Sequence, residues 1–305
     1  MISVVIPVYR ALNSLEELYA RINVVFCGIG VDYEVLFVED CGGDDSWSII
    51  QKLARDHASV RGIKMSRNYG QHNALLCGVR EARGSVIVTM DDDLQHPPEE
   101  LPKLLNKLDE GYDVVYGPPE SEQHGLLRDL ASQITKIALQ SAMGAESARH
   151  ASAFRVFRAE IRDAFSAYRS PSVNIDVLLT WGAARFAAVH VRHDSRKYGE
   201  SGYTPRKLIR HALNMMTGFS TRPLQMASML GFVFSLFGAC VLAYVCIHYL
   251  FYGSRVPGFA FLASIIAIFS GVQLLALGVI GEYIALMYFR SMERPPYLVR
   301  EQTYS

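Results

Sequence analysis

Two long runs without a charged residue limit what this chain can fold into. No Asp, Glu, Lys or Arg occurs between Pro223 and Ser254, and after Arg255 the next charged residue is Glu282. Each run exceeds the roughly 20 apolar residues that a helix needs to cross the hydrocarbon core of a bilayer. A pair of buried helices in a soluble domain fits less well, because both runs are too long and too free of charge. The sequence therefore predicts two transmembrane helices, at about residues 226–250 and 259–284, within a segment 223–289.

The basic residues around these runs predict an orientation. Lysines and arginines gather before the first run and after the second, whereas the segment between the runs carries only Arg255. Since basic residues accumulate on the cytoplasmic side, we expect both ends of the hairpin and a tail at 290–305 to be cytosolic. Apolar and basic residues interleave over residues 205–222. This pattern predicts a juxtamembrane amphipathic helix, which lies on an anionic leaflet, packs on the preceding domain, or does both.

The first part of the chain alternates short apolar runs with segments of helical periodicity. The predicted strands are Ile2–Val8, Tyr33–Val38, Val60–Met65, Ser85–Met90, Asp113–Tyr116, Ala153–Phe157 and Ala184–Val191. The predicted helices are Ser14–Phe26, Ser46–Asp56, His72–Glu81 and Pro98–Leu108. Such alternation predicts an α/β domain with a mostly parallel sheet and helices on both faces. The chain opens on an apolar strand without the basic region of a signal peptide, so we expect no such peptide.

In open sheets of this kind, ligands bind beyond the carboxyl ends of the strands. Polar residues follow four of the predicted strands, which places them in one candidate site: Tyr9, Glu39, Asp40, Arg67, Asn68 and the group that begins at Asp91. No GxGxxG motif follows the first strand, so a dinucleotide cofactor is not expected. The chain has 30 basic and 30 acidic residues, so no general attraction to nucleic acid is expected.

Three consecutive carboxylates, Asp91, Asp92 and Asp93, follow the fourth predicted strand. Like charges at this spacing repel, and a cation compensates them. In an extended stretch Asp91, Asp93 and Gln95 project to one side, and oxygen ligands of this kind suit Mg²⁺ or Mn²⁺. Asp92 projects to the other side and is expected to serve the fold. For an isolated triple aspartate, the alternative is an acidic turn that caps the helix beginning near Pro98.

Two further places carry candidate anion-binding residues. Arg128 and Ser132 lie one turn apart on the same face of a helix expected from residue 120 to about 143. Arg155 lies in a predicted strand between Phe154 and Phe157. The pattern is compatible with a solvated charge at the sheet edge and, equally, with an arginine directed at an anion or a carboxylate.

Together these motifs resemble the polyprenyl-phosphate glycosyltransferases of family 2, which have the GT-A fold. The resemblance rests on VIPVY at 5–9, VED at 38–40, SRNYGQHN at 66–73, DDDLQHPPE at 91–99, YGES at 198–201 and GEY at 281–283. It implies a GT-A domain at residues 1–204 that transfers a sugar, with inversion, from a UDP- or dTDP-sugar to polyprenyl (undecaprenyl) phosphate. It further implies a multi-pass enzyme of the bacterial inner membrane, active in cell-envelope synthesis, and a homo-oligomer, with a tetramer favoured.

The resemblance also implies roles for individual residues. The nucleotide-sugar would be bound by Pro7, Tyr9, Glu39, Asp40, Arg67, Gly70, Asp91 and Asp92. Mg²⁺ or Mn²⁺ would be held by Asp91, Asp93 and Gln95. The acceptor phosphate would be bound by Arg128, Ser132, Arg196 and Ser201. The catalytic set would be Asp93, Arg128, Arg155 and Arg196. A phosphate acceptor is already anionic, with a second pKa of about 6, so it needs cationic positioning more than a general base.

The chain departs from the family pattern at three places. Arg10 and Ala11 stand where Asn and Glu are common, Arg149 where an acidic residue is usual, and Gly202 where lysine is frequent. These changes leave both UDP- and dTDP-sugars open and indicate an altered donor sugar. Two other hypotheses remain: a non-catalytic membrane scaffold that keeps the fold, and a transferase with another acceptor, such as diacylglycerol or a growing polysaccharide.

Overall fold

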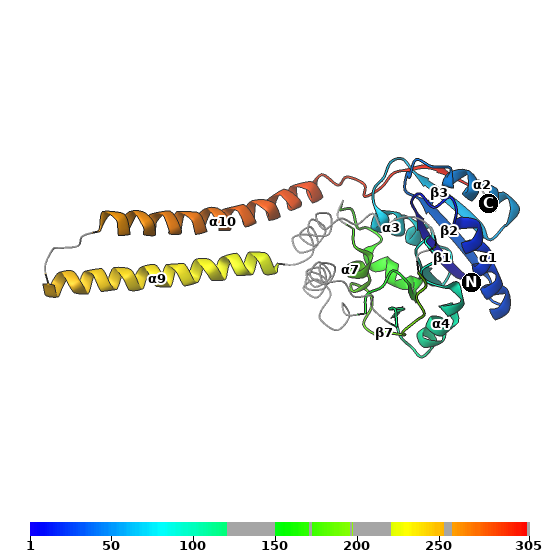
Figure 1. Ribbon diagram of the computed structural model, residues 1–305, viewed down its shortest axis with the longest axis horizontal. Helices are drawn as coiled ribbons and strands as arrows, with labels where there is room; N and C mark the ends of the chain where they lie inside the picture. Colours follow the sequence, from blue (N-terminus) through cyan, green and yellow to red (C-terminus); the bar gives the residue numbers. More distant parts are fainter. Residues whose placement is uncertain (121–149, 171–172, 196, 198–220, 253–257, 304–305) are drawn as a thin grey trace. The chain divides into compact units, whose positions relative to one another are not determined.

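The computed structural model describes residues 1–120, 150–170, 173–195, 197, 221–252 and 258–303 (Figure 1). The chain divides into two compact units. One comprises Met1–Met215 together with Glu293–Ser305, and the other comprises Met216–Met292. We call the first the catalytic-type domain and the second the apolar hairpin.

The catalytic-type domain is built on a mixed sheet. Within the described residues the sheet has eight strands in the order β7-β5-β6-β4-β1-β2-β3-β8. The strands are β1 (Ile2–Val8), β2 (Tyr33–Glu39), β3 (Val60–Met65), β4 (Val86–Thr89), β5 (Val114–Tyr116), β6 (Arg155–Arg158), β7 (Phe186–Ala188) and β8 (Val299–Gln302). The central strands β4, β1, β2 and β3 are parallel to one another, and β5 is parallel to β7. β6 runs antiparallel to β4 and β5, and β8 runs antiparallel to β3.

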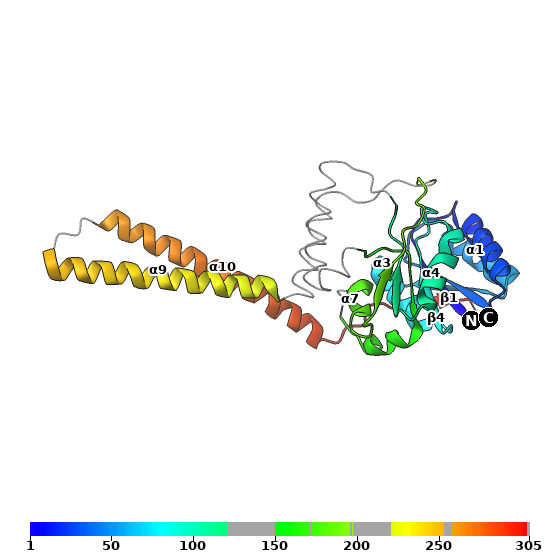
Figure 2. The same cartoon turned by 90° about the horizontal axis from the view of Figure 1, so that it is seen from below.

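Helices cover both faces of this sheet. They are α1 (Leu15–Ile29), α2 (Ser46–Asp56), α3 (Gln71–Glu81), α4 (Leu101–Asp109) and α7 (Ile175–Leu179), with 3-10 turns η1 (Pro98–Glu100) and η2 (Ala159–Phe165). One buried cluster joins α1, α2 and α4 to Val4 and Ile6, and another joins α3, η2 and α7 to Val5. Figure 2 shows α1 and α4 on one side of the sheet and α3 and α7 on the other. Because β1 is covered on both faces, all seven of its residues are buried, which explains why Ser3 is its only polar residue.

The structure confirms the predicted α/β domain with helices on both faces. β1, β3 and α2 have the predicted bounds, and the other predicted strands and helices that fall on described residues have shifted ends. Nearly all of the helix predicted from residue 120 to about 143 and of the amphipathic helix predicted at 205–222 lies outside the described residues. One element was not expected. Residues 290–305 were expected to form a tail, yet Val299–Gln302 forms β8 and completes the sheet beside β3.

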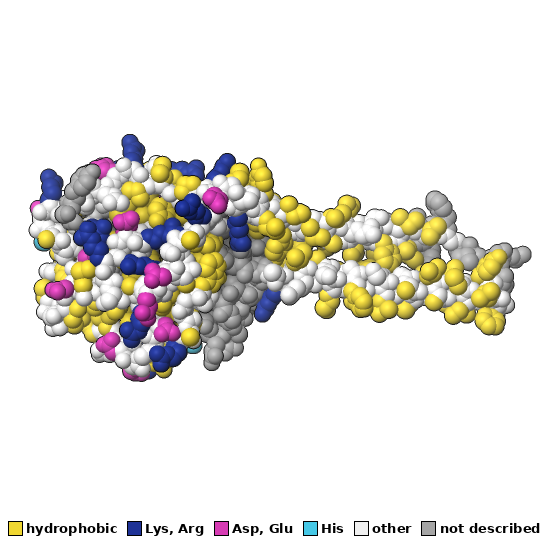
Figure 3. Space-filling view, turned by 180° about the vertical axis from the view of Figure 1, so that it is seen from behind, with side chains coloured by type: hydrophobic (Ala, Val, Ile, Leu, Met, Phe, Trp, Pro, Cys, Tyr) yellow, Lys and Arg dark blue, Asp and Glu magenta, His cyan; other side chains and the backbone are white. Residues whose placement is uncertain are grey.

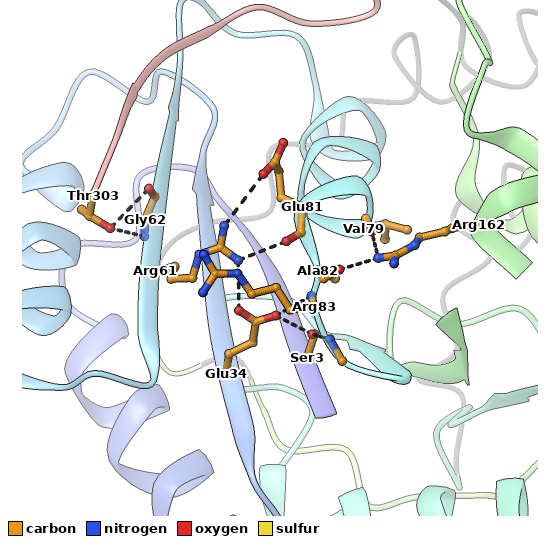
Figure 4. Close-up of polar contacts among 11 residues, drawn as sticks. Ser3, Glu34, Arg61, Gly62, Val79, Glu81, Ala82, Arg83, Arg162 and Thr303 are labelled. Carbon is orange, nitrogen blue, oxygen red and sulfur yellow. Dashed lines mark hydrogen bonds and ion pairs between the residues drawn. The ribbon is translucent and has the colours of Figure 1, made fainter. Parts of the chain in front are cut away.

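A polar network ties the amino ends of the first three strands together (Figure 4). Glu34 in β2 accepts hydrogen bonds from the Ser3 hydroxyl (2.6 Å), from the Arg83 backbone N–H (2.7 Å) and from the Arg61 guanidinium (3.0 Å). Burial opposes the charge of Glu34, but these three donors outweigh it and lower its pKa. The network lies at the end of the sheet opposite the candidate site, so it serves the fold.

The apolar hairpin consists of α9 (Arg222–Tyr252) and α10 (Phe259–Ser291). The Phe269 ring of α10 lies 5.8 Å from the Phe234 ring and 6.5 Å from the Phe237 ring of α9, measured between ring centroids. Large apolar side chains point outward along both helices (Figure 3); Leu250 and Phe251 are each 78% exposed. Over Arg222–Phe251 and Ile268–Ser291 the helices are long and apolar enough to cross a membrane. The two predicted apolar helices are therefore present.

Candidate functional site

Four loops meet at the carboxyl ends of β1, β2, β3 and β4, because these strands are parallel. The loops contact one another directly. The Asp40 N–H donates to the Val8 carbonyl (2.9 Å), and the Tyr9 N–H donates to Oδ2 of Asp92 (3.0 Å). The side-chain amide of Gln71 donates to Oδ1 of Asp91 (2.6 Å). The structure thus brings together the polar residues that the strand order places at this edge.

The backbone at this edge is strained. Among the described residues, Arg10, Cys41, Leu94 and Glu293 are the non-glycine residues with positive φ, and the first three lie in these loops, at φ 57°, 54° and 61°. Left-handed conformations of non-glycine residues are uncommon and concentrate where a site requires a fixed loop shape. At Gly70, φ is 93° with ψ 154°, a conformation that favours glycine.

Glu39 presents a buried carboxylate oxygen to this site. The side chain is 2% exposed, and its Oε1 accepts the Gly42 N–H at 2.7 Å. Its Oε2 is buried and accepts no hydrogen bond from the residues that the structure describes. On the other side of Gly42, Nε of Arg10 donates to the Gly42 carbonyl at 2.9 Å. Buried acceptors in proteins are nearly always paired, so Oε2 is suited to a donor group on a ligand.

Asp40 is fully engaged within the protein. Its two oxygens accept the Tyr69 and Gly70 N–H groups, each at 2.7 Å. Burial raises the pKa of Asp40, and the two N–H donors act in the opposite direction. Asp40 therefore fixes the β3–α3 loop (residues 66–70), in which the Arg67 guanidinium lies 4.7 Å from the centre of the Tyr69 ring. Its predicted contact with a nucleotide stays a prediction.

The three consecutive aspartates have different partners. Asp91 is bound by Gln71, Asp92 by the Tyr9 N–H, and Oδ1 of Asp93 accepts the Gln95 N–H at 3.1 Å. Asp92 thus faces the loop after β1, and its predicted contact with the nucleotide-sugar stays a prediction. Burial raises the pKa of Asp92 to about 7; the Tyr9 N–H opposes this rise, and the two neighbouring carboxylates add to it.

The predicted metal ligands Asp91, Asp93 and Gln95 supply only oxygen donors, which suits Mg²⁺ or Mn²⁺. The described residues contain no group of three His, Cys, Asp or Glu side chains arranged to hold a metal ion. The ligand set of Asp91, Asp93 and Gln95, which contains two carboxylates, therefore stays a prediction.

Arg155 is buried and ion-paired. Its side chain is 2% exposed, and Nη1 binds Oδ1 of Asp176, in the first turn of α7. The Ile175 N–H in turn donates to Nδ1 of His72 in α3 (3.3 Å). Of the two interpretations of Arg155, the structure supports a partner carboxylate. Asp176 was not identified from the sequence; its only signal is an aspartate just after the N-cap Asn174, which is also typical of a solvated helix start.

The predicted acceptor-phosphate residues Arg128, Ser132, Arg196 and Ser201 lie outside the described residues. The structure describes the residues on both sides of Arg196. The Asp194 N–H donates to the Gln95 carbonyl (2.9 Å), and the Lys197 ammonium pairs with Glu17 (2.7 Å). The described residues next to Arg196 are thus attached to the Asp91–Gln95 loop and to α1.

His96, beside this loop, packs between the rings of Phe154 (5.4 Å) and His193 (5.1 Å), measured between ring centroids. Burial lowers the pKa of His96 to about 4, and His193 adds to the effect. This shift favours the neutral imidazole, and the two ring contacts pack His96 next to the acidic loop.

The sequence is similar to known proteins. Residues 3–165 match the sequence profile described as Glycosyl transferase family 2. The chain is 34% identical over 302 residues to the undecaprenyl-phosphate 4-deoxy-4-formamido-L-arabinose transferase of Enterobacter sp. (strain 638), over 98% of this chain and 92% of that protein.

Two solved structures share the fold. One is mannosyl-3-phosphoglycerate synthase from Rubrobacter xylanophilus, with a TM-score of 0.53 and 16% identity over 75% of each chain. The other is glucosyl-3-phosphoglycerate synthase from Mycobacterium tuberculosis, in complex with Mn²⁺, uridine-diphosphate and phosphoglyceric acid. Its TM-score is 0.52 and its identity 17%, over 71% of this chain and 76% of that chain.

Proposed function

This chain belongs to glycosyltransferase family 2 and has the GT-A fold, and from that premise we propose that it transfers a sugar from a nucleotide-sugar to polyprenyl phosphate at a membrane surface. The observation that carries the proposal is the 34% identity to an undecaprenyl-phosphate sugar transferase over 98% of the chain. That similarity includes the apolar hairpin as well as the catalytic domain.

The donor would bind in the loops beyond β1, β2, β3 and β4. Oε2 of Glu39 is a buried acceptor that would pair with an N–H group of the nucleotide base, as uracil and thymine both offer. Tyr9, which is 47% exposed, and Arg67 would contact the nucleotide from the flanking loops. This assignment is compatible with either a UDP- or a dTDP-sugar.

Asp91, Asp93 and Gln95 would hold Mg²⁺ or Mn²⁺ near the diphosphate of the donor. A bound divalent cation supplies positive charge where the departing diphosphate becomes more negative. The oxygen donors of this set fit such an ion, and the Mycobacterium tuberculosis neighbour contains Mn²⁺ together with UDP on the same fold.

The acceptor phosphate would act as the nucleophile. One of its anionic oxygens forms a bond to the anomeric carbon while the bond to the nucleoside diphosphate breaks, so a single displacement inverts that carbon. Because the phosphate is already anionic, with a second pKa of about 6, no protein base is needed. Arg128, Ser132, Arg196 and Ser201 would orient the phosphate by charge-assisted hydrogen bonds. Arg155 enters the proposal as a positioning residue, because Asp176 already neutralises its charge.

The apolar hairpin would anchor the enzyme in the bacterial inner membrane. Its helices expose large apolar side chains that are stable in lipid and unfavourable in water. The domain and both chain ends would face the cytoplasm, beside the head of the lipid acceptor. Association into a homo-oligomer, with a tetramer favoured, belongs to the same proposal.

A direct assay tests the proposal. Purified full-length protein, Mg²⁺ or Mn²⁺ and undecaprenyl phosphate are incubated with a panel of radiolabelled UDP- and dTDP-sugars. We expect a labelled lipid with at least one donor and none with the Asp93→Asn variant. Normal nucleotide binding without a lipid product from any donor would favour a scaffold, and labelling of diacylglycerol would identify another acceptor.

A further inference from the structure

The chain returns to the catalytic-type domain after the second apolar helix. α10 ends at Ser291, and residues 297–303, which we call the C-terminal clamp, contain β8. β8 pairs antiparallel with β3, with Gln302 opposite Ile63 and Glu301 opposite Lys64. The clamp therefore covers an edge of the sheet that would otherwise be unpaired.

The distal end of the clamp fits closely against Gly62. The Thr303 hydroxyl accepts the Gly62 N–H at 2.7 Å (Figure 4). The Thr303 N–H donates to the Gly62 carbonyl at 2.9 Å. A Cβ atom at Gly62 would lie 2.4 Å from Ile50 and 3.2 Å from the Thr303 methyl group. Ile50 therefore leaves no space for a larger residue at position 62, and the absence of a side chain there lets Thr303 pack directly on the Gly62 backbone.

The proximal end of the clamp lies against the β3–α3 loop. The Leu298 carbonyl accepts the Ser66 N–H at 2.9 Å. The Tyr297 ring lies 5.8 Å from the Arg80 guanidinium of α3 and packs on the buried cluster around that helix. The pairing register shifts between Lys64 and Met65, immediately before the loop begins.

The β3–α3 loop thus has an anchor on each side. Ser66 at its start is bound to the clamp, and Tyr69 and Gly70 at its end are bound to the Asp40 carboxylate. Gln71, the next residue, donates to Asp91 of the acidic loop. The hydrogen bonds therefore lead from the clamp through the loop to two residues of the candidate donor site.

We propose that the C-terminal clamp is a positioning element for donor binding: residues 297–303 hold the β3–α3 loop in its binding conformation. The clamp begins a few residues after α10 ends at Ser291, so the segment that leaves the hairpin would also shape the donor site. The link to the donor rests on the function proposed above, whereas the effect of the clamp on the loop does not.

Hydrogen–deuterium exchange on the full-length protein in detergent tests the proposal. Thr303→Pro removes both the N–H and the hydroxyl that bind Gly62, and Thr303→Val removes only the hydroxyl. The matched control is Arg300→Ala, because Arg300 is an exposed residue of the same strand. We expect about tenfold faster exchange of the amides of residues 66–71 in Thr303→Pro, since the loss of one or two hydrogen bonds promotes local opening. Thr303→Val should show a smaller increase, and Arg300→Ala none.

The exchange of β1 distinguishes local opening from unfolding. Faster exchange at 66–71 with unchanged exchange at 2–8 supports the proposal. If exchange at residues 2–8 also becomes faster in Thr303→Pro, that variant unfolds more widely. The comparison of exchange at 66–71 with exchange at 2–8 is then made in Thr303→Val. Faster exchange confined to 60–65 and 299–303 in both variants would overturn the proposal.

Kinetics then relate the clamp to the donor. We expect the clamp variants to raise the KM for the nucleotide-sugar several-fold more than they lower kcat, because loop order affects binding more than chemistry. An unchanged KM in a variant with a mobile loop would overturn the link to the donor. A wild-type protein without transferase activity would refute the proposed function and leave the exchange result intact.

Discussion

Removing Asp176 should destabilise the catalytic domain strongly, because it leaves the buried Arg155 guanidinium without its carboxylate partner. Arg155 is 2% exposed and Asp176 8% exposed, so neither charge is screened by water. After Asp176→Ala, the guanidinium keeps one hydrogen bond to the described residues. This long bond runs from Nε to the Ala153 carbonyl at 3.5 Å. Breaking one side of a buried ion pair costs about 3–5 kcal/mol of unfolding free energy.

Thermal unfolding followed by tryptophan fluorescence measures this effect. The chain has two tryptophans, Trp47 and Trp181, and both lie in the catalytic domain. For a domain of this size the predicted cost corresponds to a fall in Tm of roughly 6–20 °C. The matched control is Glu16→Ala, which breaks the exposed pair of Glu16 with Lys52 and should leave the Tm nearly unchanged, because water screens that pair.

A double variant separates lost charge pairing from lost packing. Arg155→Met with Asp176→Leu removes both charges and keeps similar volumes, so it should recover most of the stability lost in Asp176→Ala. A Tm within about 2 °C of wild type for Asp176→Ala would refute the reasoning, since an unpaired buried charge costs more than that. A double variant as unstable as the single one would show that the cost arises from packing.

Two further predictions concern the site, and a third concerns a buried cysteine. Asp93→Asn, or removal of divalent metal with EDTA, should lower the initial rate of lipid labelling by roughly 100-fold or more, because a charge-stabilising group is lost; full activity in EDTA would contradict the metal assignment. Glu39→Gln should raise the donor KM by about tenfold, because the amide replaces one of two carboxylate acceptors by a donor; an unchanged KM would remove Glu39 from the nucleotide site. Burial raises the pKa of the Cys77 thiol to about 12, so in native protein at pH 8 iodoacetamide should modify the exposed Cys27 and leave Cys77 protonated and unmodified. Peptide mass spectrometry checks this, and rapid modification of Cys77 without unfolding would contradict it.

The catalytic domain was largely predictable because its central strands are buried on both faces. Burial on both faces produces the apolar run of Ile2–Val8, which only Ser3 interrupts, and the polar residues that follow mark where the strand ends. β8 was not predictable for the opposite reason. Its sequence, VREQ, is polar and mostly exposed, and the Thr303–Gly62 bonds that fix it join residues 241 positions apart. Such a strand is determined by its partner rather than by its own propensity.

The position of the candidate site was predictable, whereas the hydrogen-bond partners within it were not. Parallel strand order brings Glu39, Asp40 and Asp91 to one edge of the sheet. The sequence does not show that both oxygens of Asp40 bind backbone N–H groups, because these bonds depend on the conformation of a loop thirty residues away. In the same way, Arg155 was ambiguous until the fold placed Asp176 beside it.

The pairing of β8 with β3 also bears on how the protein is made. β3 emerges from the ribosome early, whereas residues 299–302 emerge only after both apolar helices. Until then β3 is an open sheet edge, and an open edge is prone to pair with other chains. The catalytic sheet is therefore completed after the hairpin has been synthesised. With the proposed membrane anchoring, slow insertion of α9 or α10 would prolong this exposure, so mutations in the hairpin should promote aggregation through a strand that they do not touch.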